Sequence, residues 1–114
     1  MSEKTLFSRI IDREIPSEII YEDEHCIAFR DISPQAPLHA LVVPRKPIPK
    51  VADAAAADAG LLGQLLLAAG KVAEQQGYAD AYRLVINNGS GAGQTVFHLH
   101  VHVLGGRAFK WPPG

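Results

Sequence analysis

Three histidines alternate with apolar residues in the run His98-Leu99-His100-Val101-His102, and this run constrains the fold more than any other part of the sequence. Such alternation is typical of a β-strand, because successive side chains of a strand point to opposite faces of the sheet. A strand over residues 96–104 would place the apolar members in a core and the three histidines in one row on the other face. Those apolar members are Phe97, Leu99, Val101 and Val103. Histidine is costly to bury without partners, so the row indicates a surface that uses its histidines together.

The rest of the chain predicts an α+β fold with a five-stranded antiparallel sheet and two helices. Apolar residues at helical spacing after Thr5 predict a short helix with Thr5 as its N-cap. A longer helix is predicted over residues 54–76, capped by Asp53 or Asp58 and ended by Gly77. Its apolar stripe consists of Leu61, Leu62, Leu65, Leu66, Ala69, Val72 and Ala73. Strands are predicted at residues 19–21, 26–29, 40–43, 82–86 and 96–104, with a hairpin turn at 22–25. The strands come mostly in adjacent pairs, so we expect an antiparallel sheet with the helices on one face.

Composition limits the class of protein. The 114 residues predict one domain, 1–114, with no linker. A formal net charge of -1 argues against nucleic acid or a membrane surface as partner. The single cysteine, Cys26, excludes an internal disulfide and a Cys-based zinc finger, and it suits a reducing compartment. The N-terminal residues lead into no apolar run that a signal peptide needs, and the apolar stretch at 59–69 is too short for a membrane span. We therefore expect a cytoplasmic protein.

The histidine row supports two kinds of chemistry. The outer two Cα atoms would lie roughly 13 Å apart at ~3.3 Å per residue, so one metal ion would need two of the three histidines and imported ligands such as His39. Alternatively, a neutral imidazole is a nucleophile near neutral pH, and neighbouring rings hold its tautomer or pass protons. His39 begins the strand predicted at 40–43 and is suited to orient the attacking ring. We favour catalysis, with a zinc-binding or nucleotide-binding regulatory protein as the alternative.

A glycine-rich loop precedes the histidine row, Asn87-Asn88-Gly89-Ser90-Gly91-Ala92-Gly93-Gln94-Thr95. Its three glycines allow close backbone approach, and consecutive backbone N–H groups in such turns bind anions. No helix is predicted after the loop, which argues against a Rossmann dinucleotide site. Beside the histidines, the loop is a candidate phosphate cradle.

The run from His98 to Leu104 resembles the signature of the histidine triad superfamily, in which three histidines alternate with apolar residues. The flanking motifs resemble the Hint branch of that superfamily: Asp31-Ile32-Ser33-Pro34-Gln35-Ala36-Pro37-Leu38-His39, Gly93-Gln94-Thr95-Val96-Phe97, Leu104-Gly105-Gly106-Arg107 and the tail Trp111-Pro112-Pro113-Gly114. The galactose-1-phosphate uridylyltransferase-like branch usually has Gln where this chain has His102. The Fhit-type hydrolases share the triad but lack this tail.

The resemblance implies a nucleoside phosphoramidase that acts on purine nucleotides without a metal or cofactor. His100 would attack the α-phosphorus of a nucleoside 5′-phosphoramidate, His39 would hold its tautomer, and His98 and His102 would flank it. The resemblance implies that Asn87, Gln94 and Thr95 bind phosphate oxygens or the leaving group, near Gly93, and that Asp31 binds the ribose. The base pocket would consist of Leu6, Phe7, Ile10, Phe29 and Ile32.

Two further expectations come from the same resemblance. Family members are homodimers that join two sheets into one, and the tail with Trp111 helps to complete the neighbouring active site. The chain departs from many Hint proteins at Thr95, where Ser is usual, and at Arg30, where some have His. We expect Arg30 to border the nucleotide site.

Overall fold

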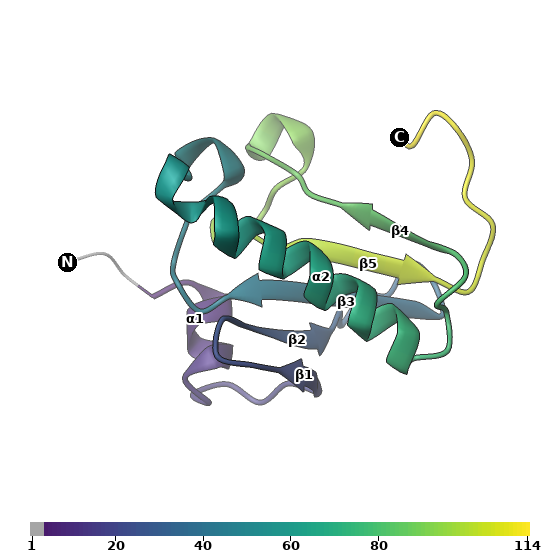
Figure 1. The fold of residues 1–114 in the computed structure, drawn as a ribbon, viewed down its shortest axis with the longest axis horizontal. Helices are drawn as coiled ribbons and strands as arrows, with labels where there is room; N and C mark the ends of the chain where they lie inside the picture. The colour runs from purple at the N-terminus through teal and green to yellow at the C-terminus, as the bar shows by residue number, and fades with distance from the viewer. Residues whose placement is uncertain (1–3) are drawn as a thin grey trace.

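The computed structural model describes residues 4–114. Residues 1–3, at the start of the segment in which no signal peptide is expected, lie outside this range. In chain order the elements are α1 (Leu6–Ile11), β1 (Ile19–Glu22), β2 (Cys26–Arg30), β3 (Leu38–Pro44), α2 (Ala59–Gln75), β4 (Tyr82–Val85) and β5 (Val101–Gly105). All neighbouring strands are antiparallel, in the order β1-β2-β3-β5-β4 (Figure 1). The predicted α+β class and the five-stranded antiparallel sheet with two helices are confirmed.

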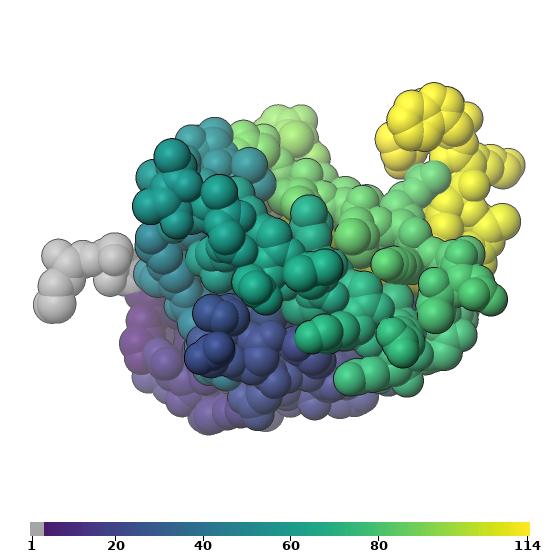
Figure 2. Space-filling view, in the orientation of Figure 1, coloured from purple at the N-terminus to yellow at the C-terminus, as the bar shows by residue number. Residues whose placement is uncertain are grey.

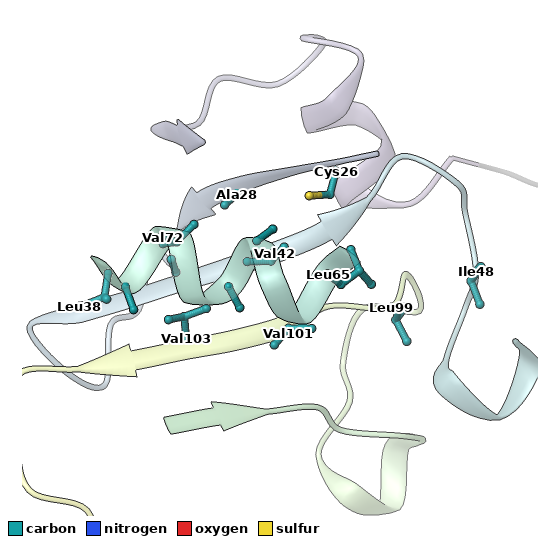
Figure 3. Close-up of a cluster of buried hydrophobic side chains, with 14 residues drawn as sticks. Cys26, Ala28, Leu38, Val42, Ile48, Leu65, Val72, Leu99, Val101 and Val103 are labelled. Atoms are coloured by element: carbon teal, nitrogen blue, oxygen red, sulfur yellow. The ribbon is translucent and has the colours of Figure 1, made fainter. Parts of the chain in front are cut away.

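The two helices pack on opposite faces of the sheet, with α2 in front of it and α1 behind it in Figure 1. Consecutive residues of β2 divide between two cores. Cys26 and Ala28 belong to the core under α2, which Figure 3 shows, whereas Ile27 and Phe29 pack with Phe7 of α1. The prediction of both helices on one face is therefore wrong. The central strands β2 and β3 carry apolar residues at consecutive positions, and such strands need cover on both faces.

The helix starts depend on two capping residues. The Thr5 hydroxyl accepts a hydrogen bond from the Ser8 N–H at 3.0 Å, so the predicted N-cap of α1 is confirmed. Asp58 occupies the N-cap position of α2, but its carboxylate accepts a hydrogen bond from the Ala55 N–H at 2.9 Å instead of from α2. The carboxylate thereby supports a short 3-10 turn at Ala56–Asp58, and α2 begins later than predicted.

One face of α2 packs on the sheet through Leu65, Ala68, Ala69, Val72 and Ala73. The predicted stripe also contained Leu66, which is 47% exposed. Gly77 follows the helix with a φ of 91°, as expected for the residue just past a helix end. By length and a mean hydropathy of 1.2, the segment Ala56–Gln75 would suffice to cross a membrane. The buried face of α2 nevertheless packs into the core of the domain.

The last strand is shorter than predicted. β5 begins at Val101 and not near residue 96. The Leu99 N–H donates to the Ile48 carbonyl at 2.7 Å, so the chain before β5 pairs with the connection after β3 and not with the sheet. Only His102 of the three histidines therefore lies in a strand.

The alternation of the run is confirmed only in part. The apolar residues Leu99, Val101 and Val103 are buried in the core under α2. Phe97 was expected in the same core but is 44% exposed, since the backbone bends through residues 96–98. His98 and His100 lie in the segment just before β5 and are buried.

Candidate active site

A cavity of about 430 Å³ opens beside α1, on the face of the sheet opposite α2. This volume is typical of small-molecule sites, which span ~300–1,000 Å³. Most of the predicted site residues lie together in its wall: Leu6, Phe7, Ile10, Phe29, Asp31, Ile32, Asn87, Gly93, Thr95, His100 and His102. The predicted residues outside the wall are His39, His98, Gln94 and Trp111.

The wall also contains residues that the sequence analysis missed, namely Ile15, Pro16, Ser17, Leu41 and Val96. Leu41 had a usable signal, because it lies two residues after His39 and so shares its face of β3. Residues 15–17 belong to the chain that returns from α1 to β1. Their place in the wall depends on how α1 packs on the sheet, which no local pattern encodes.

One ring nitrogen of His100, Nδ1, is hydrogen-bonded to the protein, and the other, Nε2, points away from that hydrogen bond. Its Nδ1 lies 2.8 Å from the His98 carbonyl oxygen, which accepts hydrogen bonds only, so Nδ1 carries the proton. In a neutral ring the Nε2 atom then keeps its lone pair. Burial lowers the pKa of His100, which favours this neutral form. The Phe7 ring stands perpendicular to the imidazole at 5.0 Å between centroids and restricts its rotation.

His98 is fully buried and ties α1 to the sheet. Its Nε2 donates to the Pro44 carbonyl at 2.7 Å, at the end of β3. Its Nδ1 then accepts a hydrogen bond from the Thr5 hydroxyl at 2.9 Å, at the start of α1. Both ring nitrogens are thus occupied by the protein, and burial lowers the pKa of the ring. His98 is placed to position the helix that carries the apolar wall of the cavity.

His39 contacts His102 and not His100. Its Nε2 lies 2.9 Å from Nδ1 of His102, and its Nδ1 accepts a hydrogen bond from the Gln35 N–H at 3.0 Å. The expectation that His39 holds His100 in its attacking tautomer is therefore wrong, because the His98 carbonyl has that place. Burial lowers the pKa of His39, and burial with the neighbouring rings lowers the pKa of His102 to about 4. Both rings are neutral at pH 7.

Asp31, His39 and His102 form a cluster whose potential metal-ligand atoms lie within 4.8 Å of one another. This spacing fits a metal ion, but the hydrogen bonds do not. Because the Gln35 N–H occupies Nδ1 of His39, the neutral ring carries its proton on Nε2, the atom that faces the cluster. A metal ion would have to displace this proton and leave an imidazolate. The donor set therefore fits a hydrogen-bonded cluster better than a metal site.

The glycine-rich loop uses several of its N–H donors in bonds within the loop. Within it, the N–H groups of Ala92, Gly93 and Gln94 donate to loop carbonyls at 3.0–3.1 Å. The prediction of a cradle made from consecutive free N–H groups is thus wrong for this part of the loop. The polar groups that the loop region offers to the cavity come from Asn87 and Thr95 instead.

Gln94 is buried and holds this loop together. Its Oε1 accepts from the Gly89 N–H at 2.8 Å, and its Nε2 donates to the Pro49 and Val96 carbonyls at 2.8 and 3.0 Å. The side-chain amide is fully used, so Gln94 supports the loop and does not offer its amide to a phosphate in this conformation. Gly93 has a φ of 98°, a backbone conformation that glycine adopts without strain.

The last two predicted positions are Arg30 and Trp111. The side chain of Arg30 extends toward α2, where it pairs with Glu18 and donates to Gln76 at 2.6 Å. Arg30 borders the cavity, as expected. Its guanidinium group nevertheless points to the other face of the sheet, as alternation along β2 requires. Trp111 is 85% exposed, in the tail that projects from the body in Figure 2.

Comparisons with known proteins agree with this geometry. The family model described as HIT domain matches residues 12–109. An uncharacterized HIT-like protein of Synechocystis is 59% identical over the whole length of both chains. The chain is also similar to the purine nucleoside phosphoramidase of Escherichia coli, with 53% identity over 108 residues that cover 94% of this chain and 91% of that protein. The crystal structure of a HIT family hydrolase from Legionella pneumophila has a TM-score of 0.94 and 46% identity, over 97% of this chain and all of that one.

Proposed function

The chain belongs to the HIT domain family, and from this premise we propose that it is a phosphoramidase of purine nucleotides. It would cleave the P–N bond of nucleoside 5′-phosphoramidates through a nucleotidyl-histidine intermediate. The observation that carries the proposal is the state of His100. Its Nδ1 proton is bound by the His98 carbonyl, so the Nε2 lone pair is available in the wall of the cavity.

The cavity has an apolar part suited to a flat base. Phe7 and Phe29 pack edge to face with 5.2 Å between ring centroids, and the aliphatic side chains of α1 and the following chain complete this part of the wall. The base pocket would consist of Leu6, Phe7, Ile10, Phe29 and Ile32, all of which line the cavity. Asp31 would accept hydrogen bonds from both ribose hydroxyls, since an ionised carboxylate is an acceptor only.

The reaction would take place in two displacements. Nε2 of His100 attacks the α-phosphorus, a new P–N bond forms to the ring, and the original P–N bond breaks as the amine leaves. The amine takes up a proton from solvent by way of the Thr95 hydroxyl. The imidazole becomes cationic in this step, and the His98 carbonyl stabilises its Nδ1–H. Water then attacks the same phosphorus, the bond to His100 breaks, and the nucleoside monophosphate and a proton are released.

Charge on the phosphoryl oxygens needs fixed donors, since preorganised hydrogen bonds lower the barrier most in a water-poor site. We assign this role to the side-chain amide of Asn87 and to the Nε2–H of His102, while the Thr95 hydroxyl faces the leaving group. No step calls for a metal or cofactor. A cytoplasmic location fits the expected nucleotide substrate.

We also propose a homodimer in which the edge strand β4 meets its counterpart. An apolar patch lies beside this edge, made of Leu66 and Leu67 on α2 with Tyr82 on β4, all exposed. Tyr82 lies against α2, because its hydroxyl would lie 3.2 Å from a Cβ at Gly70 of that helix. Edge strands and exposed apolar patches are typical of interfaces. In the dimer, the tail with Trp111 would reach the neighbouring cavity.

The test is hydrolysis of adenosine 5′-phosphoramidate by metal-free protein and by the His100→Ala variant. We expect turnover by the wild type, and a fall of roughly 10⁴-fold or more in kcat for the variant, as for loss of other enzyme nucleophiles. Mass spectrometry after rapid denaturation at alkaline pH should detect the nucleotidyl adduct on the wild type only. Equal turnover by both proteins would refute the histidine nucleophile. Nucleotide binding without any turnover would favour the regulatory alternative.

A further inference from the structure

The loop between β2 and β3, residues 31–37, is held more firmly than its exposure suggests. The Asp31 carboxylate accepts a hydrogen bond from the Ser33 N–H at 2.8 Å, and the Gln35 side chain donates to the Ser33 carbonyl at 3.0 Å. These bonds fix the internal shape of the loop. They also leave the Gln35 main chain free for contacts outside it.

The end of β5 holds the same loop from the other side. Gly106 has a φ of 93°, and a Cβ at this position would lie 2.8 Å from Cβ of Pro37. Only glycine allows this approach. The next residue, Arg107, donates from Nε to the Gln35 carbonyl at 2.8 Å, and its guanidinium group lies 4.3 Å from the Phe109 ring centre. Gln35 is thus clamped by the residue pair that directly follows β5, the strand that carries His102.

The clamped Gln35 has one contact with the histidines. Its main-chain N–H donates to Nδ1 of His39 at 3.0 Å. A ring nitrogen that accepts such a bond cannot carry a proton, so a neutral His39 has its proton on Nε2. That proton is directed to Nδ1 of His102 at 2.9 Å, which is closer than the Asp31 carboxylate at 3.4 Å. His102 in turn must have its own proton on Nε2.

We propose that Gln35 is a positioning residue of the active site, which acts through its main-chain N–H on His39 and thereby makes His102 a hydrogen-bond donor through Nε2. The role of His102 toward a phosphoryl oxygen rests on the proposed function, whereas the tautomers do not. His102 lies in the wall of the cavity. With the opposite tautomer it would present a lone pair to an anionic phosphate and repel it. One peptide group outside the cavity thus sets the polarity of a ring within it.

The tautomers are measured directly by long-range ¹H–¹⁵N NMR on protein labelled with ¹⁵N-histidine at pH 7. Protonated and unprotonated ring nitrogens have well-separated shifts. We expect His39 and His102 to carry their protons on Nε2 and His100 to carry its proton on Nδ1. A wild-type His39 protonated on Nδ1 would overturn the proposal, whatever the protein hydrolyses.

The matched variants are Gln35→Pro and Gln35→Ala. Proline removes only the N–H donor among the groups that touch His39, while alanine keeps that donor and removes the side chain. We expect Gln35→Pro to shift His39 toward a mixture of tautomers and to lower kcat roughly 10- to 100-fold, as loss of bonds that orient functional histidines does. KM should change much less, since the base and ribose contacts remain. Gln35→Ala should keep the wild-type tautomer of His39, and its kcat should fall much less than that of Gln35→Pro. Wild-type behaviour of a folded Gln35→Pro refutes the proposal.

Arg107→Gln gives a second test if Gln35→Pro does not fold. The variant loses the bond to the Gln35 carbonyl, and its matched control is Arg83→Gln, because Arg83 also lies against Phe109 but makes no contact with Gln35. We expect a smaller tautomer shift at His39 in Arg107→Gln and none in Arg83→Gln. Equal spectra for both variants and the wild type would refute the clamp. If the wild type hydrolyses no phosphoramidate, the proposed function fails while the tautomers still decide this inference.

Discussion

Among single residues, Asp31 lies beside both the cavity and a histidine of the site. Its carboxylate lines the cavity and also lies 3.4 Å from Nε2 of His39. A hydrogen bond to a charged group contributes about 1.5–3 kcal/mol, so we expect a 2′-deoxy substrate to lose roughly 10- to 100-fold in kcat/KM with the wild type. For Asp31→Asn the same deletion should cost much less. This pairing of variant and substrate isolates the ribose contact from effects on the histidines. An unchanged deoxy penalty in Asp31→Asn would assign the ribose to another residue.

The buried imidazoles make stability depend on pH. Burial lowers the pKa values of His39, His98 and His100, and the pKa of His102 falls to about 4. The unfolded chain binds protons on these rings near pH ~6.5, where the folded chain does not. The free energy of unfolding should therefore be full above that pH and fall as the pH drops toward 4.

Urea unfolding of the wild type and His102→Gln across this range checks the sign for one ring. We expect the two curves to converge as the pH drops, because the variant has lost one group that must stay neutral in the folded state. Parallel curves would mean that the pKa of His102 in the folded chain is close to its unfolded value.

Among the elements, α1 is capped by a hydroxyl that also binds a histidine of the site. The Thr5 Oγ1 atom caps the helix and donates to Nδ1 of His98, and the helix carries part of the base wall. Thr5→Val keeps the shape and removes both bonds. We expect a loss of about 1–2 kcal/mol in the free energy of unfolding, in the range for lost N-caps, together with a higher KM. Thr5→Ser retains the hydroxyl and is the control. A Thr5→Val protein with wild-type stability and KM would mean that the apolar packing of α1 and the Ser8 hydroxyl, 3.3 Å from Nδ1 of His98, suffice to hold the helix.

Local patterns predicted the elements well where one residue type decides the outcome. Thr5 as a cap and Gly77 as a helix end need only their own chemistry, and the hairpin at 22–25 is similarly local. β5 was predicted too long because alternation does not reveal which partner a strand finds. The Leu99 N–H pairs with the carbonyl of Ile48, which is far from it in sequence. This contact keeps His100 and the residues before it out of the sheet.

The candidate site was likewise predictable where residue type decides, and not where contacts between distant residues decide. Residue types and the family resemblance predicted which residues line the cavity, but not which ring touches which. His39 was expected at His100 and lies at His102, because a shift of two residues along β5 leaves a side chain on the same face. Gln94 was expected to face substrate and instead binds the loop, since an amide satisfies loop carbonyls and phosphate oxygens equally well.

At the scale of the whole molecule, one chain contains every histidine of the site, while its tail extends away from that site in an exposed conformation. Phe109 lies between Arg83 and Arg107, with 5.1 and 4.3 Å from the guanidinium carbons to the ring centre. Beyond it, Trp111 is exposed in the C-terminal tail, which projects from the body of the molecule in Figure 2. If the tail selects the leaving group in a second subunit, separation of the subunits should alter selectivity more than chemistry.

Leu67→Glu tests this dependence, because Leu67 is 65% exposed on α2 within the apolar patch beside β4. Burying an unpaired carboxylate costs several kcal/mol, so we expect the dissociation constant of the dimer to rise roughly 100-fold or more. Gln75→Glu adds the same charge on the last turn of α2 and should leave the dimer intact. Sedimentation velocity gives the assembly state, and kcat/KM for a small and a bulky amine leaving group gives the selectivity. We expect the Leu67→Glu monomer to hydrolyse the small substrate and to lose the preference that Trp111→Ala also loses. A Leu67→Glu protein that stays dimeric would mean that the subunits meet elsewhere, and a monomer with unchanged selectivity would mean that the tail serves its own chain.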